Sequence, residues 1–142
     1  MFELGTDITM EFTLKNVSRH RMLATRGASL HDLIYMDVID RRGRRVSWQG
    51  VIPSRSYPQG FFVILEPGQS STFQAVISSA NGAGYQIRMT GPYRARALFS
   101  LSPKEYFAPV SNGADVPDYS VVSNWTHFSV VATAPERGRK AK

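Results

Sequence analysis

The sequence contains no cysteine in its 142 residues. This absence excludes a disulfide framework, a thiolate metal site and a cysteine nucleophile. Long apolar runs are also absent, and none approaches the roughly 18 consecutive apolar residues that mark a membrane-spanning helix. Hydrophobic residues nevertheless make up 42% of the chain and charged residues 20%, which is typical of a globular domain with its own core.

Motifs of catalysis are missing as well. The three histidines are His20, His31 and His127, and none has the H-E-x-x-H spacing that binds zinc. The sequence has neither a G-x-S-x-G turn nor a glycine-rich phosphate-binding loop. Asp37 and Asp40 could form an acid pair, but charged residues beside a hairpin usually belong to a solvated edge. We therefore predict a chain that is not an enzyme and needs no metal or cofactor.

The start of the chain has no leader pattern. Met1 is followed directly by Phe2 and Glu3, without the positive charge and apolar stretch of a secretion signal. The compartment stays open: secreted or periplasmic if a leader has been removed, and cytoplasmic otherwise. We expect no membrane partner.

Positive charge is concentrated at the end of the chain. Lys and Arg number 17 against 11 Asp and Glu, for a net charge of +6. Residues 135–142 contain four of these basic residues and one acid, so residues 1–134 carry only +3. A short charged terminus is usually solvated and disordered. We therefore predict one domain over residues 1–134, followed by a disordered basic tail over residues 135–142.

Alternation of apolar and polar residues is the clearest structural signal. Ile8, Met10, Phe12 and Leu14 alternate with polar residues, and a period of two over eight residues indicates a half-buried strand. The apolar run 61–65 predicts a core strand. Similar patterns, separated by turn signals, predict strands at residues 8–15, 22–25, 35–40, 46–48, 61–65, 72–77, 93–99 and 126–130. The expected fold is all-β, an immunoglobulin-like β-sandwich of about seven or eight antiparallel strands.

Arginines cluster on one predicted hairpin, at Arg41, Arg42, Arg44 and Arg45. Arginine grips phosphate or carboxylate with a planar fork, so this hairpin is a candidate anion site for a nucleic acid or an acidic protein. The alternative is that these charges only protect an edge strand from aggregation. Binding to single strands also requires aromatic residues among the basic ones, and Trp48 is the only nearby candidate.

A second candidate site is the loop at residues 54–61. Arg55, Tyr57 and Phe61 combine the residue types that anchor protein interfaces. Loops at the end of a sandwich commonly carry binding. Phe61 could equally begin the core strand that follows.

Several turn and strand segments together resemble a known family. They are residues 12–18, 65–70, 91–95, 123–124 and 128–130, with Gly43 in the hairpin. This series resembles bacterial immunoglobulin-like domains found N-terminal to the catalytic region of peptidyl-Lys and deuterolysin-like metallopeptidases. It is similar, more loosely, to the intracellular proteinase-inhibitor β-sandwich family. The resemblance extends from about residue 8 to 131.

The resemblance implies an accessory module with an inhibitor-like or chaperone-like role, and it makes a protease a candidate partner. The zinc-binding H-E-x-x-H region of those peptidases is missing, and residues 103–119 have no clear counterpart.

The sequence as a whole leaves three hypotheses for function. The first is protein binding through Arg55, Tyr57 and Phe61, the second is anionic-polymer binding through the arginine hairpin and tail, and the third is a structural subunit that pairs through an edge strand. The oligomeric state is not predicted.

Overall fold

The computed structural model of this chain describes residues 1–27, 33–50, 60–101 and 119–134. In these ranges the protein is all-β, with eleven strands and no helix. None of the described elements is a helix long and apolar enough to cross a membrane. Arg55, Tyr57, His31 and the basic tail lie outside the described residues.

All eight predicted strands are present, with ends that differ by at most two residues. Three further strands bring the number above the seven or eight expected. The eleven strands are β1 (Phe2–Glu3), β2 (Ile8–Lys15), β3 (Met22–Thr25), β4 (Ile34–Ile39), β5 (Trp48–Gln49), β6 (Phe62–Leu65), β7 (Ser70–Ser78), β8 (Gly84–Tyr85), β9 (Gly91–Leu101), β10 (Tyr119–Val122) and β11 (Thr126–Val131).

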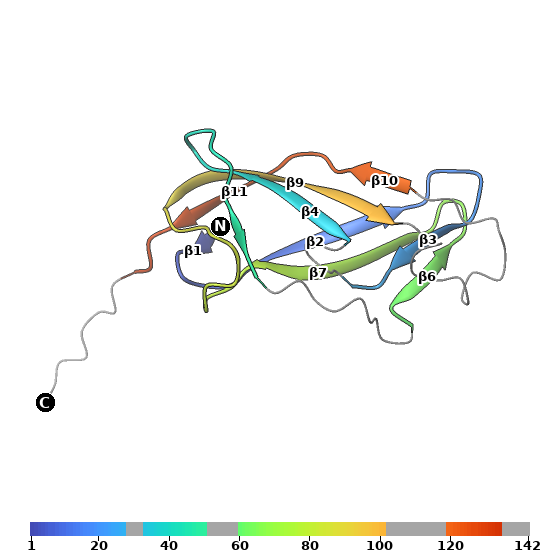
Figure 1. Cartoon of the computed structure of the whole chain (residues 1–142), viewed down its shortest axis with the longest axis horizontal. Coiled ribbons are helices and arrows are strands. Elements are labelled where there is room, and N and C mark those ends of the chain that lie inside the picture. Colours follow the sequence, from blue (N-terminus) through green and yellow to red (C-terminus); the bar gives the residue numbers. More distant parts are fainter. Residues whose placement is uncertain (28–32, 51–59, 102–118, 135–142) are drawn as a thin grey trace, which may run out of the picture.

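Sheet A is built around β9, the longest strand. One side of β9 pairs with β4, and its other side pairs first with β11 and then with β10, all antiparallel. The short strand β1 adds to β11 in parallel. Sheet B has the order β2-β7-β8-β5, and β3 with β6 forms sheet C. Figure 1 shows β4 and β9 lying over β2 and β7, with β3 and β6 at one end of the molecule.

The core lies between sheets A and B. On β9, residues Tyr93, Ala95, Ala97, Phe99 and Leu101 alternate into the interior. They meet inward side chains of β2 and β7 in one cluster of buried residues. Burying one such large side chain stabilises the fold by about 1.5–3 kcal/mol. The outer face of β9 is left to the side chains in between, among them Arg94, Arg96 and Leu98.

Two turns contain a glycine with positive φ. Gly43 in the hairpin after β4 has φ +75°, and Gly68 between β6 and β7 has φ +84°. Both values lie in the left-handed region, which glycine adopts without a steric penalty. The first of these turns places the arginine-rich hairpin at one end of sheet A.

Candidate functional site

The hairpin after β4 is organised around the carboxylate of Asp40. Oδ1 of Asp40 accepts hydrogen bonds from the backbone N–H groups of Arg42 at 2.8 Å and Arg44 at 3.0 Å. Oδ2 lies 3.0 Å from Nε and 3.0 Å from Nη2 of the Arg44 guanidinium. The side chain of Asp40 is 6% exposed, so the expectation of a solvated acid is wrong for this residue. The hairpin instead closes over the carboxylate, because its backbone donors need an acceptor.

This arrangement lowers the pKa of Asp40. The main cause is the hydrogen bond from the backbone N–H of Arg44; the N–H of Arg42 and the Arg44 guanidinium act in the same direction, against the effect of burial. Arg44 is therefore occupied by a carboxylate of its own chain. Its guanidinium group is therefore not left unpaired for an external anion.

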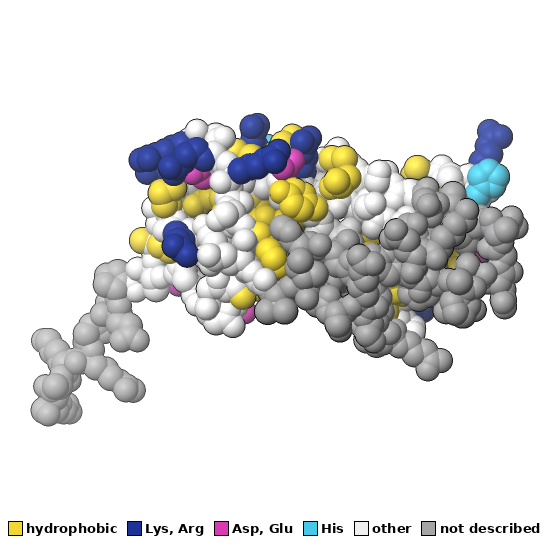
Figure 2. Space-filling model, in the orientation of Figure 1, with side chains coloured by type: hydrophobic (Ala, Val, Ile, Leu, Met, Phe, Trp, Pro, Cys, Tyr) yellow, Lys and Arg dark blue, Asp and Glu magenta, His cyan; other side chains and the backbone are white. Residues whose placement is uncertain are grey.

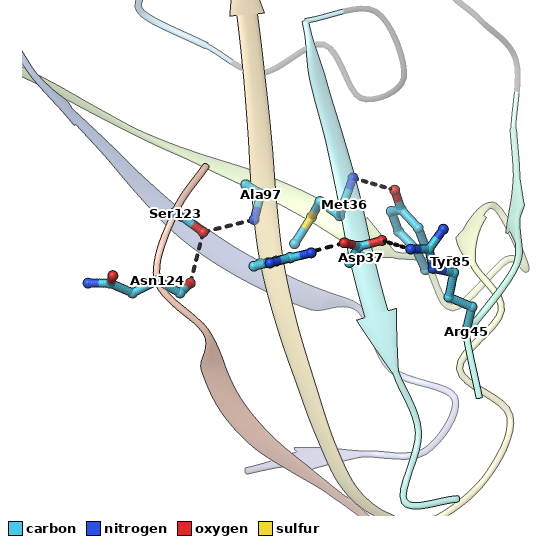
Figure 3. A network of polar contacts seen from close by, with 8 residues as sticks. Met36, Asp37, Arg45, Tyr85, Ala97, Ser123 and Asn124 are labelled. Atoms are coloured by element: carbon cyan, nitrogen blue, oxygen red, sulfur yellow. Dashed lines mark hydrogen bonds and ion pairs between the residues drawn. The ribbon is translucent and has the colours of Figure 1, made fainter. Parts of the chain in front are cut away.

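Asp37 on β4 holds two further arginines. Nη2 of Arg45 lies 3.1 Å from Oδ1 of Asp37, and Nε of Arg96 lies 3.0 Å from Oδ2. Figure 3 shows the carboxylate of Asp37 with a contact on either side. Because Asp37 is directly opposite Arg96 in the β4–β9 register, the pairing follows from the sheet itself. Of the four arginines predicted as an anion site, both Arg44 and Arg45 thus form ion pairs within the chain.

A bulge in the edge strand brings Trp125 to the same face. Val122 is opposite Leu98 and Thr126 is opposite Ala95, so three residues face two on β9. Such an extra residue is a β-bulge, which redirects the side chains next to it. Ser123 fixes the bulge: its N–H donates to the carbonyl of Ala97, and its Oγ accepts from the N–H of Ala97, both at 2.8 Å.

The indole of Trp125 packs against two arginines of β9. The guanidinium carbons of Arg94 and Arg96 lie 4.8 and 4.6 Å from its ring centroid. Both distances are within the range of cation–π attraction. The only aromatic residue that sequence proximity placed near the arginines was Trp48, which instead packs against the core. Trp125 is about 30 residues away from Arg94 in sequence, and only strand pairing shows that they meet.

An apolar row lies beside this cluster. Tyr35, Leu98 and Val122 are directly opposite one another on β4, β9 and β10. Their exposed fractions are 45%, 39% and 53%, so each presents its side chain on the outer face of sheet A. Leu98 is two residues from Arg96 on the same face of β9, which makes the row continuous with the arginines. We call Tyr35, Leu98, Val122, Trp125, Arg94 and Arg96 the outer-face patch.

The outer-face patch lies in a positively charged region. Six arginines of β9 and the hairpin are balanced only by Asp37 and Asp40, for a net charge of +4. Figure 2 shows Lys and Arg side chains gathered along the upper left of the molecule, with hydrophobic side chains next to them. None of Tyr35, Leu98, Val122 and Trp125 was predicted from the sequence as a site residue. The available signal was that Tyr35 and Leu98 are apolar at outward positions of their strands.

The predicted loop site is described only in part. Arg55 and Tyr57 lie outside the described residues, and Phe61 lies just before β6. The ring of Phe61 contacts Phe62 edge-on, with centroids 5.1 Å apart, and packs against the core. A Cβ at Gly27 would come within 2.9 Å of this ring, so Phe61 also covers Gly27.

The described residues include no group of three or more histidine or acidic side chains arranged to hold a metal ion. His127 is exposed on the outer face of β11, opposite Arg94. No protein family has a model that matches the chain, and no curated protein is significantly similar to it.

Proposed function

We propose that this chain is a non-catalytic protein-binding module and that it binds its partner through the outer-face patch. The observation that carries the proposal is the exposed row Tyr35, Leu98 and Val122 next to the Arg–Trp cluster. Trp, Tyr and Arg are enriched among the residues that dominate protein interfaces. The partner is therefore expected to offer an apolar side chain for the row and carboxylates for the arginines.

A protein partner fits this surface better than a nucleic acid. Leu98 and Val122 offer apolar contact but no planar ring for base stacking, and the ring of Trp125 already contacts the guanidinium groups of Arg94 and Arg96. Arg44, Arg45 and Arg96 already pair with Asp37 or Asp40, which reduces their attraction for phosphates. Paired arginines remain useful at a protein interface, because the carboxylates hold their guanidinium groups in fixed positions.

The immunoglobulin-like assignment is part of the same proposal. It is supported by two sheets that share one core and by the predominance of antiparallel pairing. The resemblance to accessory domains of metallopeptidases makes a protease the first class of partner to test. An inhibitor-like or chaperone-like role on that protease would need no catalytic group in this chain.

The test uses the full chain, a panel of purified metallopeptidases, and proteins captured from an extract and then purified. Leu98→Glu places a charge in the centre of the row and is expected to weaken binding at least about 30-fold, or about 2 kcal/mol. The matched control is Val76→Glu on β7, since Val76 is 43% exposed on sheet B. Circular dichroism checks that both variants fold.

Equal binding by Leu98→Glu and the unmodified chain would refute the outer-face patch as the site. Equal loss in Leu98→Glu and Val76→Glu would place the site elsewhere or indicate a nonspecific effect. If the molecule captured from the extract is a nucleic acid, and its affinity falls steeply as the salt concentration rises, then counterion release drives binding. The anionic-polymer hypothesis would then replace this proposal.

A further inference from the structure

One edge of β2 has no partner strand among the described residues, and we call it the unpaired edge. Within the described residues β2 pairs only with β7, which leaves it as the last strand of sheet B. Its single irregularity is a shift between Ile8 and Thr9, and the pairing from Thr9 to Lys15 is regular. Regular edge strands are templates for pairing with another chain unless something interrupts them. The edge of β10 and β11, by contrast, is interrupted by the bulge at Ser123.

Hydrogen bonding at the end of β2 shows which backbone groups point outward. The N–H of Asn16 donates to the carbonyl of Gln69 at 2.9 Å, on the β7 side. Bonding direction alternates along an antiparallel strand, so Leu14 and Phe12 also point their backbone groups toward β7. The N–H and C=O groups of Glu11, Thr13 and Lys15 therefore point to the unpaired edge.

A groove lined by both apolar and polar side chains lies beneath this edge. It has a volume of about 740 Å³ and runs between β2 and the opposite edge of sheet A. Phe12 and Leu14 line it from β2, and Phe99, Val121 and Phe128 line it from sheet A. Val121 is opposite the buried Phe99 and so faces inward, yet it is 45% exposed. The interior is thus open on this side.

We propose that β2 pairs with β2 of a second copy of this chain, in antiparallel orientation about a two-fold axis at Thr13. In that register Glu11 of each copy is directly opposite Lys15 of the other, and Thr13 is opposite Thr13. All three pairs use backbone groups that point to the unpaired edge, so the register forms six backbone hydrogen bonds. On the inner face, Phe12 of each copy meets Leu14 of the other at the mouth of the groove.

Charge complementarity selects this register and this occupant. Shifting the axis to Phe12 places Glu11 opposite Thr13 and loses both ion pairs. Shifting it to Glu11 places two like charges directly opposite each other, which is destabilising. The residues directly opposite Glu11 and Lys15 on β7 are Gln74 and Ser70, both neutral, so β7 offers these two charges no oppositely charged cross-strand neighbour.

The experiment measures the mass of the full chain over a range of concentrations by sedimentation equilibrium. The unmodified chain is expected to form a dimer as its concentration rises. Glu11→Lys and Lys15→Glu each replace two attractive pairs with two repulsive ones, and each is expected to raise the dimer dissociation constant at least about tenfold. The double variant with both substitutions restores opposite charges and is expected to dimerise like the unmodified chain.

Glu3→Lys on β1 serves as the matched control, because it makes the same charge change as Glu11→Lys away from this edge. It is expected to leave the dissociation constant unchanged. A monomer at every concentration would overturn the proposal. So would a dimer that the single variants leave intact, or a double variant that stays monomeric while circular dichroism shows it folded. Leu98→Glu lies on sheet A and is expected to leave this equilibrium unchanged, so failure of the outer-face patch and failure of the dimer are separate results.

Discussion

The carboxylates of Asp37 and Asp40 hold three arginines of this protein in place. Asp40 accepts hydrogen bonds from two backbone N–H groups and one guanidinium, and Asp37 joins Arg45 to Arg96. Arginines that are free in solution sample many rotamers, and ordering them costs free energy on binding. The two aspartates remove part of that cost before any partner arrives.

The ionisation of Asp40 makes the stability of the folded protein depend on pH in the acidic range. Because its pKa is lowered in the folded protein, its contribution is complete above the ordinary value of 3.8 and is lost as pH falls through the lowered value. Asp40→Asn lacks this contribution at every pH. The unfolding free energy of the unmodified chain is therefore expected to exceed that of Asp40→Asn at neutral pH, and the gap should narrow with acidification.

Urea unfolding from about pH 7 to about pH 3 measures this gap. Glu3→Gln, at an exposed position on β1, controls for the loss of one negative charge. A gap between the unmodified chain and Asp40→Asn that stays constant with pH would show that ionisation of Asp40 is not its cause.

Strands with a full alternation of side chains could be predicted from the sequence, whereas the short strands β1 and β8 could not. The patterns of β2, β7 and β9 are set by burial on one face, which the sequence records directly. β1 and β8 have two residues each, and β8 begins at Gly84 with φ +91°. Such strands exist because a neighbour pairs with them, so no local pattern predicts them.

The continuous apolar run 61–65 illustrates a different error. It predicted a core strand, but β6 pairs only with β3 among the described strands, and Ile64 is 39% exposed. An apolar run is compatible with burial on both faces of a strand, yet it does not ensure that both faces are buried.

The outer-face patch could not be predicted from the sequence for a related reason. Its six residues come from four segments that strand pairing and a bulge bring together.

The bulge itself can be tested at Ser123. Ser123→Ala removes the acceptor for the N–H of Ala97 and is expected to lower the unfolding free energy by about 1–3 kcal/mol. Ser129→Ala makes the same change on the exposed face of β11 and is expected to cost less than about 0.5 kcal/mol. Urea unfolding measures both, and equal effects would contradict the proposed role of the Ser123 side chain.

At the scale of the whole molecule, three hydroxyl groups join the three sheets. Tyr85 of sheet B accepts a hydrogen bond from the N–H of Met36 in sheet A at 2.9 Å. Tyr119 of sheet A donates to the carbonyl of Leu23 in sheet C. Ser71 of sheet B donates to the carbonyl of Thr25, also in sheet C, at 2.7 Å. Apolar burial between sheets has no direction, so these directional bonds help to fix how the layers align.

The two tyrosines also make stability depend on alkaline pH. Burial raises the pKa of Tyr85 and of Tyr119 to about 12. In the unfolded chain both ionise near the ordinary value of 10, so the unfolded state loses protons before the folded state does. The unfolding free energy is therefore expected to fall as pH rises above about 10.

Substitution of one tyrosine separates this effect from general alkaline damage. Tyr85→Phe leaves the buried N–H of Met36 without its acceptor, so it costs about 1–3 kcal/mol at neutral pH. It also removes the proton that Tyr85 would release, so its unfolding free energy should decline less steeply above about pH 10 than that of the unmodified chain. Tyr35→Phe, at a position 45% exposed, controls for the loss of one tyrosine hydroxyl. Identical slopes in the unmodified chain and Tyr85→Phe would show that ionisation of Tyr85 does not cause the fall in unfolding free energy at alkaline pH.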